Sequence, residues 1–226
     1  MALVTYQEQD AFSLITLDDG KANALSFNMA DELDSALDQG FESGKVIVLA
    51  GRPGKFSAGF DLNVMGKMDA DSQRLLKRGA DIAGRLAHSE TPVIAAVTGH
   101  ALAMGALICL SADYRLGTRG AFKLGLNEVA IGMTLPWFGI ELAQERVIEA
   151  HAHQVVTLAR IYNPEDAVEA GILDACCEPE DLMTMAASTA EQFAALDMPS
   201  FAATKARLRE GFASRWQTAM ARDFGE

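Results

Sequence analysis

Apolar runs and amphipathic segments alternate along the first half of the chain. Residues 11–17 mix apolar and polar positions and end in an Asp-Asp-Gly turn signal at 18–20, which predicts a strand closed by a tight turn. The continuous apolar runs at 45–50 (KVIVLA) and 91–97 (TPVIAAV) are typical of strands that are covered on both faces. Residues 113–116 predict a further short strand. We therefore expect these segments to form a buried sheet.

Helical periodicity separates the predicted strands. Apolar residues recur at Met29, Leu33 and Leu37, after Ser26 and before Gly40, which predicts an amphipathic helix with a serine cap and a glycine stop. Further helices are predicted at 71–88, 101–111 (buried, beginning near Met104), 141–160, 164–171, 180–196 and 199–212. Strands that alternate with helices favour an α/β fold of βαβ units with right-handed crossovers.

The strand signals fade after Pro136, and the last third of the chain is predicted to be helical. We therefore predict one α/β core over residues 1–196, followed by a helical segment, 197–226, that serves packing or assembly.

The composition excludes several classes of function. Half of the 226 residues are apolar, the net charge is −12 and the basic residues form no run, so the chain lacks the basic surface of a nucleic-acid-binding protein. The apolar stretches are too short for a membrane span, and residues 1–10 lack the features of a signal peptide. Three cysteines without a CxxC pair favour a reducing, cytoplasmic compartment and indicate no metal site.

Two glycine-bearing turns follow predicted strands. Residues 56–62 contain small residues that let a ligand approach the backbone, and residues 98–105 run into a helix whose N-terminus favours negative charge. Two such turns supply two N–H donors to one carbonyl oxygen, and each preorganised donor stabilises a developing oxyanion by roughly 2.7–4 kcal/mol. A surface turn and a tightly packed helix entry are the alternative interpretations of the two segments.

Glu128 is the candidate base for such chemistry. It lies in the sequence Gly-Leu-Asn-Glu at 125–128, and the apolar residues 129–131 follow, so its carboxylate is expected to be partly desolvated with a raised pKa. An exposed or paired carboxylate is the alternative, and periodicity does not place Glu128 beside the two turns.

These motifs resemble the crotonase (enoyl-CoA hydratase/isomerase) superfamily across nearly the whole chain. FSAGFDL (56–62) resembles the AGxD oxyanion loop of that family, and VIAAVTGHALAMGA (93–106) resembles its second oxyanion segment. KLGLNEVAIGMTLP (123–136) is similar to the GLNE motif of mitochondrial-type Δ3,Δ2-enoyl-CoA isomerases. The resemblance implies a spiral of ββα units that assembles as a homotrimer or hexamer through the C-terminal helices.

The resemblance also implies roles for particular residues. The backbone N–H groups of Phe60 and Met104 would form the oxyanion hole, although Met104 stands where the family normally has glycine. Glu128 matches the second glutamate of the hydratases, and Leu107 stands at the place of the first. Residues implied to contact coenzyme A or the acyl group are Ser57, Ala58, Gly59, Asp61, Leu62, Gly105, Leu107 and Lys205, the last facing a neighbouring subunit.

A single acid suits an isomerase, because one carboxylate can take a proton from C2 and return it at C4. The expected substrate is an acyl-CoA thioester in fatty acid β-oxidation, with no metal and no cofactor beyond the coenzyme A of the substrate. One alternative is hydration, with a second acid from Asp61 or from the helix after Pro136. Another is a non-catalytic acyl-CoA-binding protein, and for Lys205 a solvated helix face is the default expectation.

Overall fold

Nine strands form two sheets in the computed structural model, which describes residues 2–225. The larger sheet has six strands in the order β1-β2-β3-β5-β7-β9. They are β1 (Val4–Glu8), β2 (Phe12–Leu17), β3 (Val46–Gly51), β5 (Val93–Val97), β7 (Tyr114–Thr118) and β9 (Ala175–Cys177). The pair β1–β2 is antiparallel, and every later neighbouring pair is parallel. A mostly parallel sheet requires cover on both faces.

The smaller sheet consists of β4 (Gly54–Ser57), β6 (Gly99–Leu102) and β8 (Leu124–Gly125), all parallel. Each of its strands directly follows a strand of the larger sheet, and each pair leads into a helix. The unit ββα is therefore repeated three times, with its first strand in the large sheet and its second in the small one. This repetition places the ends of β4, β6 and β8 side by side.

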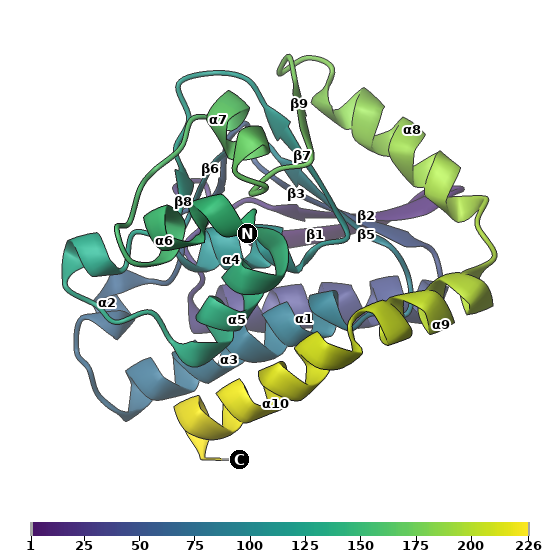
Figure 1. The fold of residues 1–226 in the computed structure, drawn as a ribbon. Helices are drawn as coiled ribbons and strands as arrows, with labels where there is room; N and C mark the ends of the chain where they lie inside the picture. Colours follow the sequence, from purple (N-terminus) through teal and green to yellow (C-terminus); the bar gives the residue numbers. More distant parts are fainter. Residues whose placement is uncertain (1, 226) are drawn as a thin grey trace.

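Helices cover both faces of the large sheet (Figure 1). The helices of the first two thirds are α1 (Phe27–Ser43), α2 (Leu62–Met65), α3 (Ala70–Ala87), α4 (Met104–Ser111), the 3-10 turn η1 (Val129–Ile131), α5 (Trp137–Arg146) and α6 (Glu149–Val156). Those of the last third are α7 (Pro164–Glu169), α8 (Leu182–Ala194), α9 (Met198–Leu208) and α10 (Glu210–Phe224). Helix α8 packs on one face of the sheet, and α1 packs on the other with α3 beside it.

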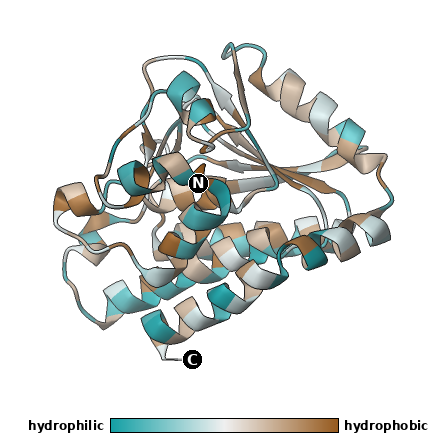
Figure 2. Ribbon diagram, viewed as in Figure 1, coloured by the Kyte–Doolittle hydropathy of each residue, from teal (hydrophilic) through white to brown (hydrophobic). Residues whose placement is uncertain are grey.

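The core is therefore divided between the two faces of the sheet. In β3, Ile47 and Leu49 join the larger apolar cluster, whereas Val46, Val48 and Ala50 join the cluster under α8. This two-sided burial explains the uninterrupted apolar run of that strand. Figure 2 shows the central strands in hydrophobic colours, while α3 and α10 mix both kinds of residue.

The C-terminal helices pack on the same core. Phe212, Trp216 and Ala219 are buried in the larger cluster, and the Trp216 ring lies 5.9 Å from the ring of Phe138 in α5, centroid to centroid. Helix α10 therefore contributes to the interior of its own chain, and its predicted role in assembly stays a prediction.

Capping residues determine where the first predicted helix begins and ends. Ser26 is confirmed as its N-cap, because the hydroxyl accepts a hydrogen bond from the Met29 N–H at 3.2 Å. The predicted stop at Gly40 is wrong. The helix continues to Ser43 and ends at Gly44, whose φ of 66° suits a left-handed C-cap. Gly40 instead gives room to Ile47, which would lie 3.2 Å from a Cβ at that position.

The predicted single helix at 141–160 is also wrong. It consists of α5 and α6, because Val147 and Ile148 adopt extended backbone angles between them. The strands β1, β4, β6, β8 and β9 were missed or absorbed into loops, since they are short and lack a clear alternation of apolar and polar residues.

Candidate active site

Hydrogen bonds hold the loop after β4 against the segment before α1. The Ser57 hydroxyl donates to the Asn23 carbonyl at 2.7 Å and accepts from the Gly59 N–H at 3.2 Å. The Leu25 N–H donates to the Gly59 carbonyl at 2.7 Å, and the Asp61 N–H donates to the Leu25 carbonyl at 3.0 Å. These bonds fix the backbone on both sides of residue 60.

Asn23 supports this loop, a role that sequence reasoning missed. Its side-chain amide lies 2.8 Å, 3.0 Å and 3.1 Å from the carbonyl oxygens of Leu17, Lys55 and Phe56, to which it donates. Its φ of 52° lies in the left-handed region, which asparagine tolerates better than most residues. The sequence indicated only that an asparagine lies three residues after the turn signal at 18–20.

The turn between β6 and α4 has an unusual backbone. Ala103 adopts φ 49° and ψ −125°, a conformation that costs a non-glycine residue about 1–3 kcal/mol. Its N–H donates to the Gly125 carbonyl at 3.0 Å, and its carbonyl accepts from the Leu107 N–H at 3.0 Å. The turn makes Met104 the first residue of α4, where backbone N–H groups have no partner inside the helix.

The two turns lie against each other. A Cβ built on Gly59 would be 2.8 Å from the Cβ of Ala103 and 3.3 Å from the backbone nitrogen of Met104. A Cβ built on Gly105 would be only 2.3 Å from the Ser57 carbonyl oxygen. Both glycines are therefore required by this close approach, and Gly59 also has φ 95°.

Two backbone donors remain free where the turns meet. Within residues 2–225, neither the Phe60 N–H nor the Met104 N–H donates to a protein acceptor. The N-terminal end of α4 adds its positive dipole at the same place. This arrangement has the composition of an oxyanion hole, and the role of the two N–H groups in it stays a prediction.

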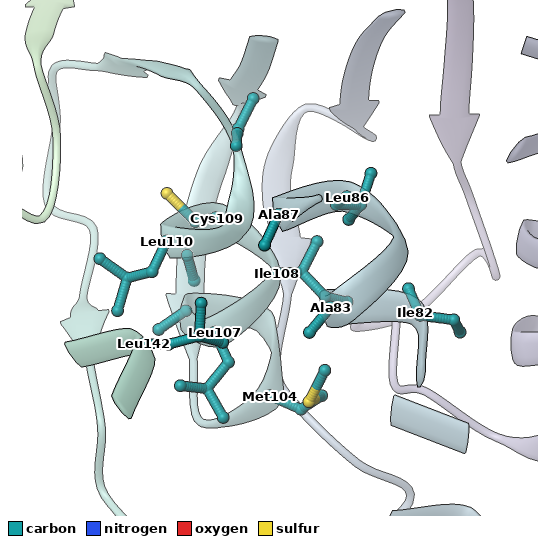
Figure 3. Packing of buried hydrophobic residues seen from close by; sticks show 14 of the residues in the cluster. Ile82, Ala83, Leu86, Ala87, Met104, Leu107, Ile108, Cys109, Leu110 and Leu142 are labelled. Carbon is teal, nitrogen blue, oxygen red and sulfur yellow. The ribbon is translucent and has the colours of Figure 1, made fainter. Parts of the chain in front are cut away.

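The side chains of Phe60 and Met104 turn toward α3. A Cβ built on Gly79 would be 2.5 Å from Phe60 Cζ and 3.1 Å from Met104 Sδ. Met104 is fully buried and belongs to the apolar cluster that also contains Ile82 and Ala83 of α3 (Figure 3). The Met104 side chain, which stands where the family normally has glycine, is therefore accommodated in the core. Its backbone N–H donor is retained.

The small sheet joins the segment that precedes Glu128 to the same turn. Gly125 pairs with Leu102 at the end of β6 and accepts the hydrogen bond from Ala103, next to Met104. Glu128 follows Gly125 by three residues, and its carbonyl accepts from the Met133 N–H at 2.9 Å. This register places Gly125 next to the turn before Met104, and the position of the Glu128 carboxylate beside the two donors stays a prediction.

The Glu128 side chain is buried, and one of its two carboxylate oxygens has no partner. The residue is 8% exposed, and no polar group of the described chain bonds Oε2. Desolvation raises the pKa of Glu128 from 4.5 to about 7. A carboxylate with a pKa near neutrality can both accept and return a proton, which is the property required of a general acid/base.

Asn127 adds a second unusual polar group beside Glu128. Its Oδ1 atom is buried and has no hydrogen-bond donor within the described part of the chain. Buried polar atoms without partners are rare in folded proteins and concentrate at functional sites. The sequence motif pointed to the glutamate alone.

The other acids near these elements are already engaged. Leu107 of α4 is apolar and 1% exposed, so its position supplies no acid. Asp61 caps α2 through the Asn63 N–H at 2.9 Å. Glu141 and Glu145 of α5 pair with Arg215 at 2.8 Å and 2.9 Å. One oxygen of each of these three carboxylates therefore already has a partner.

The remaining predicted contact residues divide into two groups. Ser57, Gly59 and Gly105 are buried in the contact between the two turns, whereas Ala58 and Leu62 are exposed on the first loop.

Lys205 does not join this cluster. It is 8% exposed, and its ammonium group donates to Asp113 at 2.8 Å and to Ser89 at 3.1 Å. Asp113 lies just beyond the C-terminal end of α4, away from the end that begins at Met104. The default expectation of a solvated helix face is wrong for Lys205, because its side chain is buried against Asp113 and Ser89.

Two further structural properties concern the described residues. Residues 2–225 contain no group of three or more His, Cys, Asp or Glu side chains arranged to hold a metal ion. No helix in this range combines the length and the apolar character needed to cross a membrane.

Comparison with known proteins defines the class. The model of the enoyl-CoA hydratase/isomerase family matches residues 7–225, so the chain belongs to that family. A solved enoyl-CoA hydratase/isomerase family protein from Pseudomonas syringae superposes with a TM-score of 0.95 at 37% identity, covering 98% of this chain and 96% of that one. The predicted crotonase-like spiral with a helical C-terminal segment is thereby confirmed.

Relatives of similar identity carry different activities in their names. Human mitochondrial enoyl-CoA delta isomerase 1 is 31% identical over 202 residues, which cover 87% of this chain and 67% of the human protein. The short-chain-enoyl-CoA hydratase of Clostridium acetobutylicum is 28% identical over 231 residues, with coverage of 99% and 88%. The family membership is therefore established, and the choice between isomerisation and hydration depends on the site.

Proposed function

We propose that this protein is a Δ3,Δ2-enoyl-CoA isomerase that moves a double bond in an acyl-CoA thioester. The observation that carries the proposal is that Glu128 has the one buried carboxylate within residues 2–225 and follows β8, which pairs with the strand that leads into the turn before Met104. The isomerase name of the human relative supports the same activity.

The proposed reaction begins with binding of the thioester oxygen by the Phe60 and Met104 N–H groups. Glu128 removes a proton from C2 of the 3-enoyl chain, and the electron pair of the C2–H bond forms a dienolate with its negative charge on the thioester oxygen. Glu128 then returns the proton to C4, so that the double bond lies between C2 and C3. No atom is gained or lost, and the enzyme is restored.

The physical properties of the two N–H donors and of the Glu128 carboxylate suit these steps. Each preorganised N–H donor is expected to stabilise the dienolate oxygen by roughly 2.7–4 kcal/mol. A pKa of Glu128 near 7 leaves a large fraction ionised at neutral pH and still lets the protonated form give the proton back. General acid/base catalysis of this kind contributes about 10²- to 10⁴-fold.

Hydration is the second candidate, because relatives named as hydratases match nearly the whole chain. Hydration needs one group to activate water and another to deliver a proton. Leu107 is apolar, and the carboxylates of Asp61 and Glu141 are engaged in a helix cap and an ion pair. These contacts favour isomerisation over hydration.

A non-catalytic acyl-CoA-binding protein is a third possibility that the site disfavours. A desolvated carboxylate with one unpartnered oxygen destabilises a folded protein, and a binding protein gains nothing from it. We further propose that no cofactor is required beyond the substrate's own coenzyme A, and that the chain works as a homotrimer or hexamer.

The test compares two substrates with the wild-type protein. Isomerisation of a 3-enoyl-CoA is measured as an increase in the absorbance of the conjugated thioester. Hydration of crotonyl-CoA is measured as a decrease in the same absorbance. The proposal predicts isomerisation with little or no hydration. Hydration without isomerisation would favour the second candidate, and binding without either reaction would favour the third.

A further inference from the structure

A cavity of about 290 Å³ lies at the carboxyl ends of the parallel strands of the large sheet, beside the beginning of α8. Thr98 directly follows β5 and Thr118 ends β7, and both residues line it. In open α/β sheets, ligands bind outside the carboxyl ends of strands. Within the described chain, the lining includes neither Phe60, Met104 and Glu128 nor any residue of the predicted assembly segment that begins at 197. The cavity is therefore distinct from the candidate active site and from those helices.

Two threonines project into this cavity from neighbouring strands. Val97 of β5 pairs with Gly117 of β7 in the parallel register. Thr98 and Thr118 are the next residues of these strands, so they lie opposite each other, with Cα atoms about 5 Å apart. Side chains alternate between the faces of a strand, and Ala96 belongs to the apolar cluster under α8. Both threonine side chains therefore point to the face that α8 covers.

Both hydroxyls are buried without hydrogen-bond partners. Within residues 2–225, neither Oγ1 of Thr98 nor Oγ1 of Thr118 has a partner, and Thr118 is 3% exposed. A buried hydroxyl without a partner destabilises a folded protein, and such groups are rare outside functional sites. One ligand oxygen between the two strands can accept a hydrogen bond from each hydroxyl, because two bonds of about 2.8 Å span the separation.

The lining favours a neutral ligand, because none of the described residues that bound the cavity carries a charge. Residues of both signs adjoin the lining residues in sequence without lining the cavity themselves: Arg52, Lys55, Arg119, Lys123, Glu178, Glu180 and Asp181. An anion or a cation bound here would lose its hydration without gaining an opposite charge at hydrogen-bond distance.

The rest of the lining is mainly apolar. Phe122, Pro179 and Leu182 contribute to it, and Met183, which is 39% exposed, connects it to solvent. The volume lies at the lower end of the range of about 300–1,000 Å³ for small-molecule sites. At about 30 Å³ for each water-sized group, it holds about nine non-hydrogen atoms. The matching ligand is therefore compact, with one polar group on an apolar body.

We propose that this cavity binds a compact neutral carbonyl compound whose oxygen accepts hydrogen bonds from Thr98 and Thr118. The apolar body of the ligand lies between Phe122 and the first turn of α8. Binding gives both hydroxyls the partner that the chain itself does not supply. This inference does not depend on the proposed isomerase activity.

The test is a titration of the full chain with benzamide, benzoate and benzamidine, monitored by ligand-observed nuclear magnetic resonance. The three probes have nearly the same shape and differ in charge. The wild type is expected to bind benzamide at least about tenfold more tightly than either ion, because no charged group lines the cavity. Absence of saturable benzamide binding, or binding of either ion as tight as that of benzamide, would overturn the proposal.

The double variant Thr98→Val and Thr118→Val removes both hydroxyls and keeps the shape of the side chains. It is expected to weaken benzamide binding at least about fivefold, because each hydrogen bond contributes about two- to tenfold. Thr91→Val removes another buried hydroxyl that has no partner and lies outside the cavity, so it should bind benzamide as the wild type does. Both valine variants are expected to be at least as stable as the wild type. Wild-type affinity in the double variant would contradict the proposed contacts.

Met183→Trp is the second variant, because a larger side chain at this position fills part of the cavity. It is expected to weaken benzamide binding at least about tenfold without lowering the melting temperature, since Met183 is partly exposed. Met185→Trp, at a methionine of the same helix that is 41% exposed and outside the lining, is the matched control. Wild-type binding by Met183→Trp, or displacement of benzamide by crotonyl-CoA, would overturn the proposal. Retention of benzamide binding in Glu128→Gln separates this site from the proposed catalytic one.

Discussion

Replacing Glu128 by glutamine is expected to stabilise the folded protein at alkaline pH. The carboxylate has a pKa of about 7 in the folded chain, against 4.5 for an ordinary glutamate, because burial disfavours its charged form. Between these values the folded state holds a proton that the unfolded state has lost. Stability contributed by this group is therefore present below pH 4.5 and falls as the pH rises toward 7.

The size of the effect follows from the same values. At about 1.4 kcal/mol for each pKa unit, the rise from 4.5 to about 7 corresponds to about 3 kcal/mol above pH 7. Glutamine has nearly the same shape and carries no charge, so Glu128→Gln avoids this cost at every pH. For a chain of this length the gain corresponds to an increase of roughly 6–12 °C in Tm at pH 8.

The assay is thermal unfolding of the wild type and of Glu128→Gln at pH values from 4.5 to 8. The difference in Tm is expected to be small at the acid end and to grow through the range in favour of the variant. Glu145→Gln, which removes one partner of the surface ion pair with Arg215, is the control and should change stability by less than about 1 kcal/mol. A variant that is less stable than the wild type at pH 8 would show that Glu128 is a paired structural carboxylate, and would refute the reasoning.

Three further outcomes are expected. The kcat/KM of the wild type should fall about tenfold for each pH unit below 7, because Glu128 must be ionised to accept the C2 proton; a flat profile between pH 5 and 8 would exclude it as the base. Gly59→Ala should lower turnover by at least about tenfold and cost about 1–3 kcal/mol in a urea titration, since φ is 95° and the new Cβ lies 2.8 Å from that of Ala103; a fully active, stable variant would contradict this contact. Asp113→Asn should cost about 3–5 kcal/mol by the same titration, because Lys205 and Arg209 lose their shared carboxylate, and a loss under 1 kcal/mol would show that the pair is solvated.

Local sequence signals predicted the elements whose stabilisation is itself local. The Ser26 cap and the apolar spacing of α1 were sufficient to predict that helix, and the uniform apolar run of β3 predicted two-sided burial. The C-terminal end of α1 was predicted at the wrong residue, because two glycines in this segment could have ended the helix. Gly44 caps the helix, and Gly40 only makes room for Ile47, a contact between elements that no local pattern reveals.

Local motifs indicated candidate residues for the site, but not the long-range contacts that surround them. The motif around Glu128 indicated the candidate base. The pairing of β8 with β6, which brings Gly125 next to the turn before Met104, could not be predicted because β8 has only two residues. The supporting amide of Asn23 and the strained turn at Ala103 depend on long-range contacts as well. Lys205 was misjudged for the same reason, since its burial follows from the way α9 folds back over Asp113.

The most direct measurement of the central claim is the turnover of a 3-enoyl-CoA to the conjugated 2-enoyl isomer by the wild type and by Glu128→Gln at pH 8. Both proteins are expected to be folded at this pH and to bind the thioester through the same N–H groups. The account predicts that kcat falls by about 10²- to 10⁴-fold in the variant, while binding of the thioester is retained. Isomerisation at the wild-type rate in Glu128→Gln would contradict a mechanism in which this one carboxylate carries the proton from C2 to C4.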